Sequence, residues 1–175
     1  MNLTLGERLR SLSQEPFAAV REIGVVEGRR VADIGAGRGY FTIPAAITVG
    51  RAGLVYSVEP DPKRSATIGA RAAREGLGNV RVLTAKAENL AGIPAGEVDL
   101  AFSAFSVHHF KDRSAALAEI RRILRDGGEF YLWDRVPGRI FKWGTRPEEL
   151  AQMAAGFARV ETLSTRKTIR ARFTK

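Results

Sequence analysis

The segment VADIGAGRGYF, residues 31–41, passes from an apolar run into three glycines that alternate with other residues. Gly35, Gly37 and Gly39 stand where the first predicted strand turns into the first predicted helix. Glycine permits positive φ and lacks the Cβ that would obstruct a ligand, and the helix N-terminus offers free N–H groups. The segment therefore predicts a strand, a tight turn and a helix, with backbone passing very close to a bound ligand.

Short β-branched runs alternate with longer alanine-rich stretches along the chain, which predicts an α/β fold with a parallel sheet and helices on both faces. Parallel strands are expected at 30–35, 53–59, 80–85, 97–103 and 129–134. The closing segments, 157–163 and 166–173, are expected to form an antiparallel pair, because no crossover fits between them. By the two-residue period, one face of the last strand carries Ile169, Ala171 and Phe173, and the other carries Arg166, Thr168, Arg170 and Arg172.

Capping residues indicate where the first two helices begin and end. A helix is expected over 40–49, in which Phe41 faces the core. The second helix is expected to begin where Asp61 caps its N-terminus and Pro62 takes its first position. The sequence GLGN, residues 76–79, is expected to end it.

Two further helices are expected in the second half of the chain. The first has an apolar stripe, and the glycines of DGG, residues 126–128, are expected to stop it; the stripe is formed by Leu117, Ile120 and Leu124. Thr145 and Glu148 form a capping box for a helix that runs to about Ala155.

The composition limits the class of protein. With 175 residues, 45% of them apolar, the chain is expected to form one domain over 1–175, with a helical lead-in over 1–28. Because it has no cysteine and two histidines, we expect no disulfide and no metal site. The N-terminus is mixed and charged, and no apolar run approaches the roughly 18 residues of a membrane span. These features predict a soluble, cytoplasmic protein without a membrane partner.

The residues around the glycines indicate which ligand the turn suits. A dinucleotide-binding turn has the spacing GxGxxG, whereas this chain has GxGxG preceded by Asp33. A carboxylate at this position would repel a pyrophosphate, but it suits a ligand with an ammonium group. Glu59, 24 residues after Gly35, ends the second predicted strand, where a carboxylate can accept both hydroxyls of a ribose.

From about residue 20 to about residue 135 the chain resembles the class I S-adenosylmethionine-dependent methyltransferases, of the small-molecule, type 11-like kind. The motifs that carry the resemblance are the run 31–41, SVEPDP (57–62), KAENL (86–90) and VDLAFSAFSVHHF (98–110). The resemblance implies a three-layer Rossmann-like methyltransferase fold with a mostly parallel twisted sheet of about seven strands. It also implies S-adenosyl-L-methionine as cofactor and S-adenosyl-L-homocysteine as product.

By the same resemblance, each part of the cofactor has expected contacts. Asp33 and the loop 35–39 would bind the methionine part, and Ser103 would face the cofactor from the tip of the fourth strand. On the adenine side, Glu88 would substitute for the acid that the family commonly has where this chain has Lys86. The full set of expected cofactor-binding residues is Asp33, Gly35, Ala36, Gly37, Gly39, Tyr40, Glu59, Pro60, Ala87, Glu88 and Ser103.

The implied reaction is an in-line displacement at a sulfonium methyl, which needs alignment and exclusion of water. Where the acceptor must lose a proton, His109 is the first candidate for the base and His108 the second. A neutral imidazole is a suitable base near neutral pH, and both residues follow the fourth strand at the edge where such folds bind ligands. The plain structural reading is that one of the two histidines packs or caps while the other faces the cleft.

The acceptor is expected to be a small molecule. Residues 103–106 read SAFS and not the Asn-Pro-Pro-Tyr of related amide and exocyclic-amine methyltransferases. The absence of cysteine argues against covalent addition to a pyrimidine carbon and against methylation of thiolate-bound arsenite. The long segment 135–149, with Phe141 and Trp143, is expected to form a substrate lid. The alternative is that it packs at the core edge or against a second copy in a homo-oligomer.

Positive charge is concentrated at the end of the chain, since residues 135–175 carry +7 of the net +9. One alternative function is therefore methylation of RNA, with Arg166, Arg170 and Arg172 contacting phosphates. Another is a protein that binds S-adenosylmethionine without transferring its methyl group, or that binds a different nucleoside. A solvated basic surface is the plain reading of the same residues.

Overall fold

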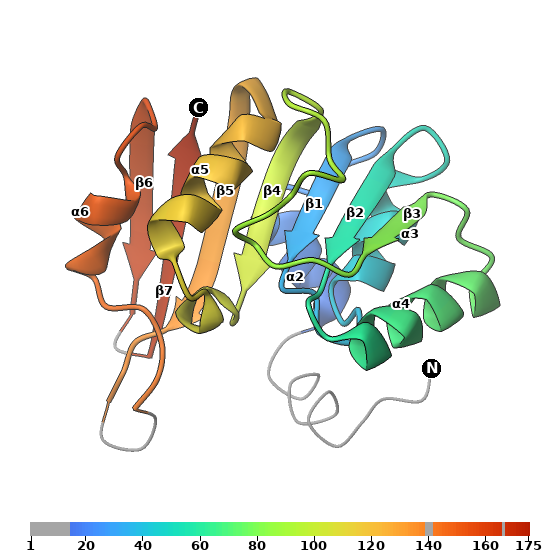
Figure 1. Ribbon diagram of the computed structural model, residues 1–175, viewed down its shortest axis with the longest axis horizontal. Helices are drawn as coiled ribbons and strands as arrows, with labels where there is room; N and C mark the ends of the chain where they lie inside the picture. Colours follow the sequence, from blue (N-terminus) through green and yellow to red (C-terminus); the bar gives the residue numbers. More distant parts are fainter. Residues whose placement is uncertain (1–14, 139–141, 166) are drawn as a thin grey trace.

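The computed structural model describes residues 15–138, 142–165 and 167–175, and their strands form one sheet (Figure 1). The strand order is β3-β2-β1-β4-β5-β7-β6. The strands are β1 Arg30–Ile34, β2 Leu54–Val58, β3 Val80–Leu83, β4 Val98–Ala104, β5 Leu124–Arg135, β6 Arg159–Ser164 and β7 Thr168–Thr174. β1 to β5 are parallel, and β7 runs antiparallel to both β5 and β6. The predicted α/β fold with an antiparallel C-terminal pair is confirmed.

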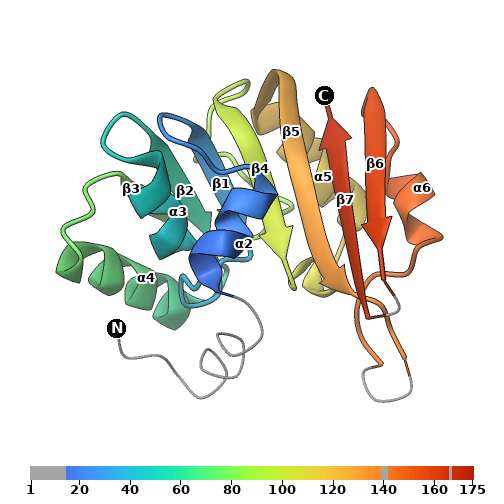
Figure 2. The same cartoon turned by 180° about the vertical axis from the view of Figure 1, so that it is seen from behind.

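Helices cover both faces of this sheet. They are α2 Pro16–Ile23, α3 Thr42–Val49, α4 Pro62–Arg74, α5 Arg113–Ile123 and α6 Glu149–Met153, with a 3-10 turn, η1, at Val107–His109. α2 and α3 lie on one face (Figure 2), and α5 lies on the other (Figure 1). Of the lead-in expected over 1–28, residues 1–14 lie outside the described residues. Within the described ranges, no helix has the length and apolar character needed to cross a membrane.

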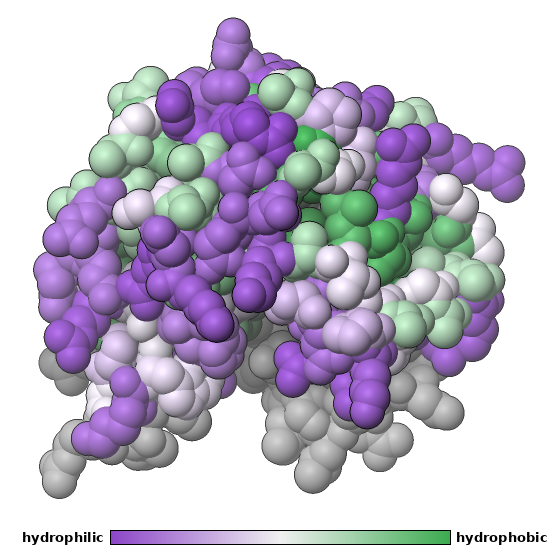
Figure 3. Space-filling model, viewed as in Figure 1, coloured by the Kyte–Doolittle hydropathy of each residue, from purple (hydrophilic) through white to green (hydrophobic). Residues whose placement is uncertain are grey.

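Each face of the sheet has its own apolar core, because successive side chains of a strand point to opposite faces. Val31 of β1 packs with Phe102 and the apolar residues of α2 and α3. Its neighbour Ala32 packs on the other face, with Ile120 of α5 and Phe130 of β5. On the face that carries α5, apolar side chains remain visible over β2 and β3 (Figure 3), where the residues of β3 are only half-buried or exposed.

Two local sequence patterns, a helix cap and an alternation in a strand, form the elements that they predict. Asp61 caps α4, where its carboxylate accepts hydrogen bonds from the N–H groups of Lys63 and Arg64 at 2.8 and 3.3 Å. In β7 the alternation is confirmed, because the residues of the predicted apolar face are all buried: Ile169, Ala171 and Phe173.

The expected end of the third helix is wrong. α5 ends at Ile123, and Leu124 is the first residue of β5, paired with Val98. The next pair along the ladder joins Leu100 to Glu129, so the DGG sequence lies in an irregularity inside the strand. A Cβ at Gly128 would approach two backbone carbonyl oxygens at 2.8 and 3.2 Å, which explains glycine there. The glycines therefore permit a tight bulge and do not stop the helix.

The expected capping box at Thr145 is also wrong. The Thr145 hydroxyl donates to the buried carboxylate of Asp134 at 2.8 Å. α6 begins at Glu149, whose own carboxylate accepts a hydrogen bond from the Arg146 N–H at 2.8 Å, and ends at Met153. The Thr145 hydroxyl therefore makes a tertiary contact with Asp134 and does not cap the helix.

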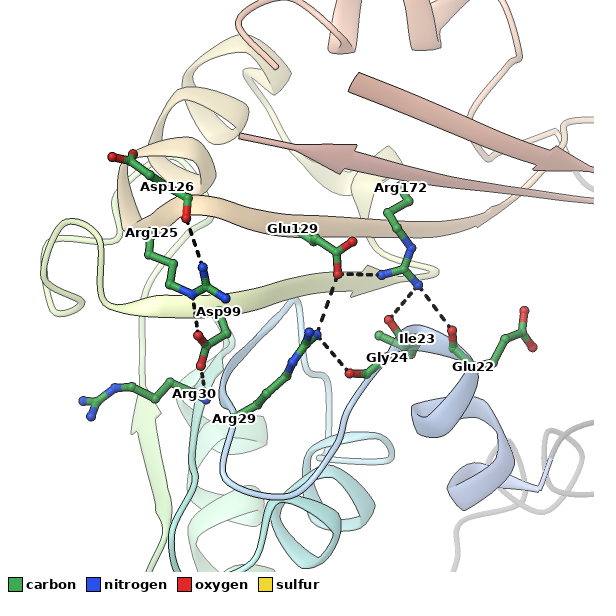
Figure 4. Close-up of polar contacts among 10 residues, drawn as sticks. All are labelled: Glu22, Ile23, Gly24, Arg29, Arg30, Asp99, Arg125, Asp126, Glu129 and Arg172. Carbon is green, nitrogen blue, oxygen red and sulfur yellow. Dashed lines mark hydrogen bonds and ion pairs between the residues drawn. The ribbon is translucent and has the colours of Figure 1, made fainter. Parts of the chain in front are cut away.

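Arg172 of β7 holds the end of α2 against the sheet (Figure 4). Arg172 donates to Glu129 Oε2 at 2.9 Å and to the carbonyl oxygens of Ile23 and Glu22 at 3.1 and 3.5 Å. These carbonyls end α2, where a helix favours positive charge. Arg29 adds a contact of 3.7 Å to Glu129. The network joins the first described helix to the last strand of the chain.

Arg170 takes part in the same attachment. Its guanidinium pairs with Glu22 at 2.6 Å and lies 4.4 Å from the centroid of the Trp133 ring. Burial and the Glu22 carboxylate raise the pKa of Tyr131 to about 12, so its hydroxyl stays protonated and donates to Glu22 at 3.2 Å. Arg166 lies outside the described residues. Arg170 and Arg172 therefore have intramolecular partners, and nothing in their geometry favours a role on RNA phosphates.

Replacement of Arg172 is expected to loosen α2. We expect Arg172→Ala to lower the free energy of unfolding by about 1.5 to 3 kcal/mol, the range for a hydrogen bond that involves a charged group. Hydrogen exchange should quicken at the α2 amides. Arg159→Ala is the control, because the Arg159–Glu161 pair lies on an exposed edge strand, where an ion pair contributes about 0 to 1 kcal/mol. Equal losses in the two variants would contradict this account.

Candidate functional site

A cleft of about 650 Å³ lies at the carboxyl ends of β1, β2 and β4, the edge at which open α/β sheets bind ligands. Its volume is in the range of small-molecule sites. The expected site residues that line it are Asp33, Gly35, Ala36, Gly37, Tyr40, Glu59, Pro60, Ala87, Glu88 and His109. Three expected residues do not line it: Gly39, Ser103 and His108.

The three glycines of the turn all have positive φ, but for different reasons. At Gly35 a Cβ would collide with the side chain of Ser106. At Gly37, where φ is +62°, a Cβ would meet nothing within 4 Å and would project into open space. At Gly39 a Cβ would press on Ile68 of α4 at 3.3 Å, so this glycine serves helix packing and not the cleft.

Asp33 is the penultimate residue of β1 and is almost completely buried. The hydroxyl of Thr42 donates to its carboxylate at 2.6 Å. Burial raises the pKa of Asp33 to about 7, although the bond from Thr42 lowers it; the negative charge of Glu59 raises it further. Near neutral pH this carboxyl group therefore takes up or loses a proton readily, and a cation in the cleft would favour its ionised form.

Glu59 follows β2 and is also buried, with 4% of its surface exposed. Its Oε2 accepts a hydrogen bond from the Gly37 N–H at 2.8 Å, and its Oε1 accepts one from the Asp61 N–H at 3.1 Å. The carboxylate thus joins the glycine turn to the start of α4. Both acids, Asp33 and Glu59, line the cleft.

Glu88 lines the cleft but is already engaged. Its Oε1 accepts hydrogen bonds from the N–H groups of Lys111 and Asp112 at 2.7 and 3.1 Å. Although burial raises it, these backbone groups hold the pKa of Glu88 below its usual range. The carboxylate therefore stays ionised and holds the segment before α5 beside Ala87 and Lys86, which also line the cleft.

The end of β4 differs in detail from the expectation. Ser103 is fully buried, and its hydroxyl is 2.6 Å from that of Ser106. Ser106 lines the cleft and donates to the Ile34 carbonyl oxygen at 2.9 Å. Phe105, also on the cleft, has a φ of +58°, a strained conformation for an aromatic residue. The sequence SAFS contains both serines, but nothing in it indicates which one the turn directs toward the cleft.

The two histidines occupy different environments. His109 lines the cleft. The pKa of His109 is lowered by burial and by the neighbouring His108, while Asp134 raises it, so the ring is neutral near neutral pH. The His108 side chain is 6% exposed and contacts Asp134 through Nδ1 at 3.0 Å. Sequence reasoning did not identify Asp134, because the two residues lie 26 positions apart.

The segment 135–149 borders the site without lining it. Its described residues are absent from the cleft wall, and residues 139–141, with Phe141, lie outside the described residues. Trp143 is 43% exposed and stacks on His108 with 4.8 Å between ring centroids. The described part of the segment therefore contacts residues beside the cleft, such as His108, and does not line the cleft itself.

A family model described as a methyltransferase domain matches residues 32–132, more than half of the chain. The matched region contains the glycine turn, both buried acids and the segments after β3 and β4. The chain belongs to the class I S-adenosylmethionine-dependent methyltransferases.

Relatives of this methyltransferase domain include two curated proteins that are named as methyltransferases. Aklanonic acid methyltransferase DauC of Streptomyces sp. strain C5 is 36% identical over 122 residues, which cover 70% of this chain and 53% of that protein. Nocamycin O-methyltransferase of Saccharothrix syringae is 36% identical over 129 residues, 73% of this chain and 42% of that protein. The chain therefore spans about half the length of these curated relatives.

Solved structures with the same fold include a SAM dependent methyltransferase from Aquifex aeolicus. That structure superposes with a TM-score of 0.79 at 24% identity and covers 91% of this chain and 89% of that one. The [4+2]-cyclase SpnF superposes with a TM-score of 0.77 at 18% identity and covers 97% and 81%. At these sequence identities the superpositions show the fold alone.

The cleft of the methyltransferase domain fits the cofactor of its family. The open space in front of Gly37 admits a ligand against bare backbone, as the family's methionine-binding turn requires. Asp33 offers a buried carboxylate for an ammonium group, and Glu59 offers a second one for a sugar diol. These two acceptor groups suit a cationic nucleoside such as S-adenosylmethionine.

The raised pKa of Asp33 predicts how the stability of the methyltransferase domain depends on pH. The folded, ligand-free protein keeps a proton on Asp33 up to about pH 7, whereas the unfolded chain releases it near the ordinary value of 3.8. The free energy of unfolding should therefore fall as the pH rises between these values. Asp33→Asn, which has the same shape, should remove this fall and make the protein more stable than wild type above pH 7. Chemical denaturation across this range measures it, and identical pH profiles for both proteins would refute the assignment.

Proposed function

We propose that the protein transfers a methyl group from S-adenosylmethionine to a small-molecule acceptor. The observation that carries this proposal is the pair of buried acids, Asp33 and Glu59, which line the cleft together with an open glycine turn. The names of DauC and the nocamycin enzyme, whose acceptors are small molecules, support the acceptor class. The RNA alternative lacks such support, because Arg170 and Arg172 are engaged with α2.

Each part of the cofactor has proposed partners on the cleft wall. We assign the ammonium group to Asp33, with the turn around Gly37 against the methionine chain, and the ribose diol to Glu59. Ala87 and Glu88 border the adenine. We assign to Ser106, which lines the cleft, the role that the family resemblance implied for Ser103.

When bound, the cofactor supplies an electrophilic methyl group that carries its own leaving group. The chain's contribution is then to align the acceptor, to exclude water and to accept a proton. Phe105 and Tyr40 give the cleft apolar wall area for this. His109 is the group that we assign to accept the acceptor's proton, because it lines the cleft and is neutral near neutral pH.

Calorimetric titration with S-adenosylhomocysteine tests the cofactor assignment. Below about pH 7 Asp33 must release its proton before it can pair with an ammonium group, so affinity should fall by up to about tenfold per pH unit of acidification. Asp33→Asn should bind weakly at all pH values. The control is Asp61→Asn, because Asp61 is an exposed helix cap. No heat from wild type with either S-adenosylmethionine or its demethylated product would overturn the proposed function.

Two glycines with similar backbone angles separate binding from backbone strain. Gly37 and Gly76 have φ values of +62° and +67°, and at both a Cβ would meet nothing within 4 Å. Each Gly→Ala variant should therefore lose about 1 to 2 kcal/mol of stability from the left-handed conformation. Only Gly37→Ala should also lose affinity for S-adenosylhomocysteine, because only its Cβ projects into the cleft. Equal affinities in the two variants would argue against a ligand on this turn.

A further inference from the structure

Asp134 is a fully buried carboxylate at the end of β5 that does not line the cleft. Both of its oxygens lie near His108 Nδ1, at 3.0 and 3.1 Å. It also accepts hydrogen bonds from Thr145 Oγ1 and from the Arg135 N–H, each at 2.8 Å. A carboxylate that accepts from the other two groups fits a His108 tautomer that donates through Nδ1.

Arg135 and Thr145 lie where the two ends of the segment 135–149 meet, and we call this pair the neck of the segment. The Thr145 N–H donates to the Arg135 carbonyl oxygen at 2.9 Å. Gly144, with a φ of +140°, passes so close that a Cβ would collide with the Arg135 carbonyl group. Trp143 then stacks on the His108 ring at an interplanar angle of 28°. The neck is thus joined to His108 twice, through Asp134 and through an aromatic stack.

The same group of residues touches the cleft wall. The rings of His108 and His109 are 4.1 Å apart between centroids, and His109 lines the cleft. The Arg135 guanidinium lies 5.7 Å from the Phe105 ring, also on the cleft, and 5.3 Å from the Trp143 ring. The neck and the wall that faces the acceptor therefore share a continuous set of contacts.

We propose that Asp134 is a positioning residue, which fixes the His108 imidazole and the neck of the segment 135–149 as one unit behind His109 and Phe105. This inference rests on the proposed function, because it places the unit on the side of the cleft where the acceptor would bind. Its geometry does not depend on the cofactor. Asp134 acts through His108 and Thr145 and touches no reacting atom.

The unit also sets the electrostatic surroundings of His109. The charged and titratable groups that act on this ring are His108, Asp134, Arg64 and Glu59. The carboxylate of Asp134 raises the pKa of His109, and His108 lowers it. Replacing Asp134 should therefore lower the pKa of His109, and replacing His108 should raise it. A purely structural role for Asp134 would not produce these opposite shifts.

Nuclear magnetic resonance of the imidazole nitrogens tests the proposal on the whole ligand-free chain. Only two histidines are present, so both rings can be assigned from single replacements. In wild type we expect His108 to carry its proton on Nδ1. Asp134→Asn should weaken this preference, because one amide oxygen replaces two acceptor oxygens for three donors, and it should lower the pKa of His109. His108→Asn should raise the pKa of His109. An Nε2–H tautomer in wild type, or an unchanged His109 titration in Asp134→Asn, would overturn the proposal.

Tryptophan fluorescence tests the neck separately. Trp133 is 1% exposed and Trp143 is 43% exposed, so a soluble quencher such as acrylamide reports mainly on Trp143. Thr145→Val should increase quenching while His108 keeps its Nδ1 proton. Thr165→Val is the matched control, because among the described residues the Thr165 hydroxyl contacts Lys167 and Thr168 at the exposed β6–β7 turn. Equal quenching in both variants would refute the coupling. Because no cofactor enters these measurements, their result is independent of whether S-adenosylmethionine binds.

Discussion

The carboxylate of Asp33 at the end of β1 is the constraint on which the site depends. Burial disfavours its charged form, and Glu59 adds a second negative charge nearby. Within the described part of the chain, Thr42 is the residue that donates a hydrogen bond to it. A cation in the cleft would favour the ionised form of such a group. The glycine turn keeps side chains away from the space before it, so the same local structure that strains the ligand-free protein prepares it for binding.

The basic composition has a structural explanation in part. Arg170 and Arg172 come from the last strand, yet they contact Glu22 and the end of α2, about 150 residues earlier in the chain. Net charge by sequence region could not show this, because it counts cations without their partners. Arg170 also lies over Trp133, so part of its function is to cover an aromatic ring. A positive C-terminal segment is here a means of attaching a helix.

Local patterns predicted those elements whose partners are local. The Asp61 cap and the alternation in β7 depend on residues within three positions of each other, and both were correct. Thr145 and the DGG sequence have equally plain local patterns, but their outcome was decided by Asp134 and by β4. The same limit applies to the site. The motif located the glycine turn and the acids, whereas Gly39 and Ser103 do not line the cleft, for reasons of packing that no spacing reveals.

Two buried acids at strand ends show how the number of donors distinguishes ligand binding from positioning. An ionised carboxylate has about four acceptor sites. Asp134 receives donors from a ring nitrogen, a hydroxyl and a backbone N–H, so its capacity is largely filled by the protein. Asp33 receives one hydroxyl and faces the cleft, so its capacity is left for a ligand. We therefore assign the first acid to the positioning of protein groups and the second to the binding of a cationic ligand. Conserving both oxygens matters for Asp134, while conserving the negative charge matters for Asp33.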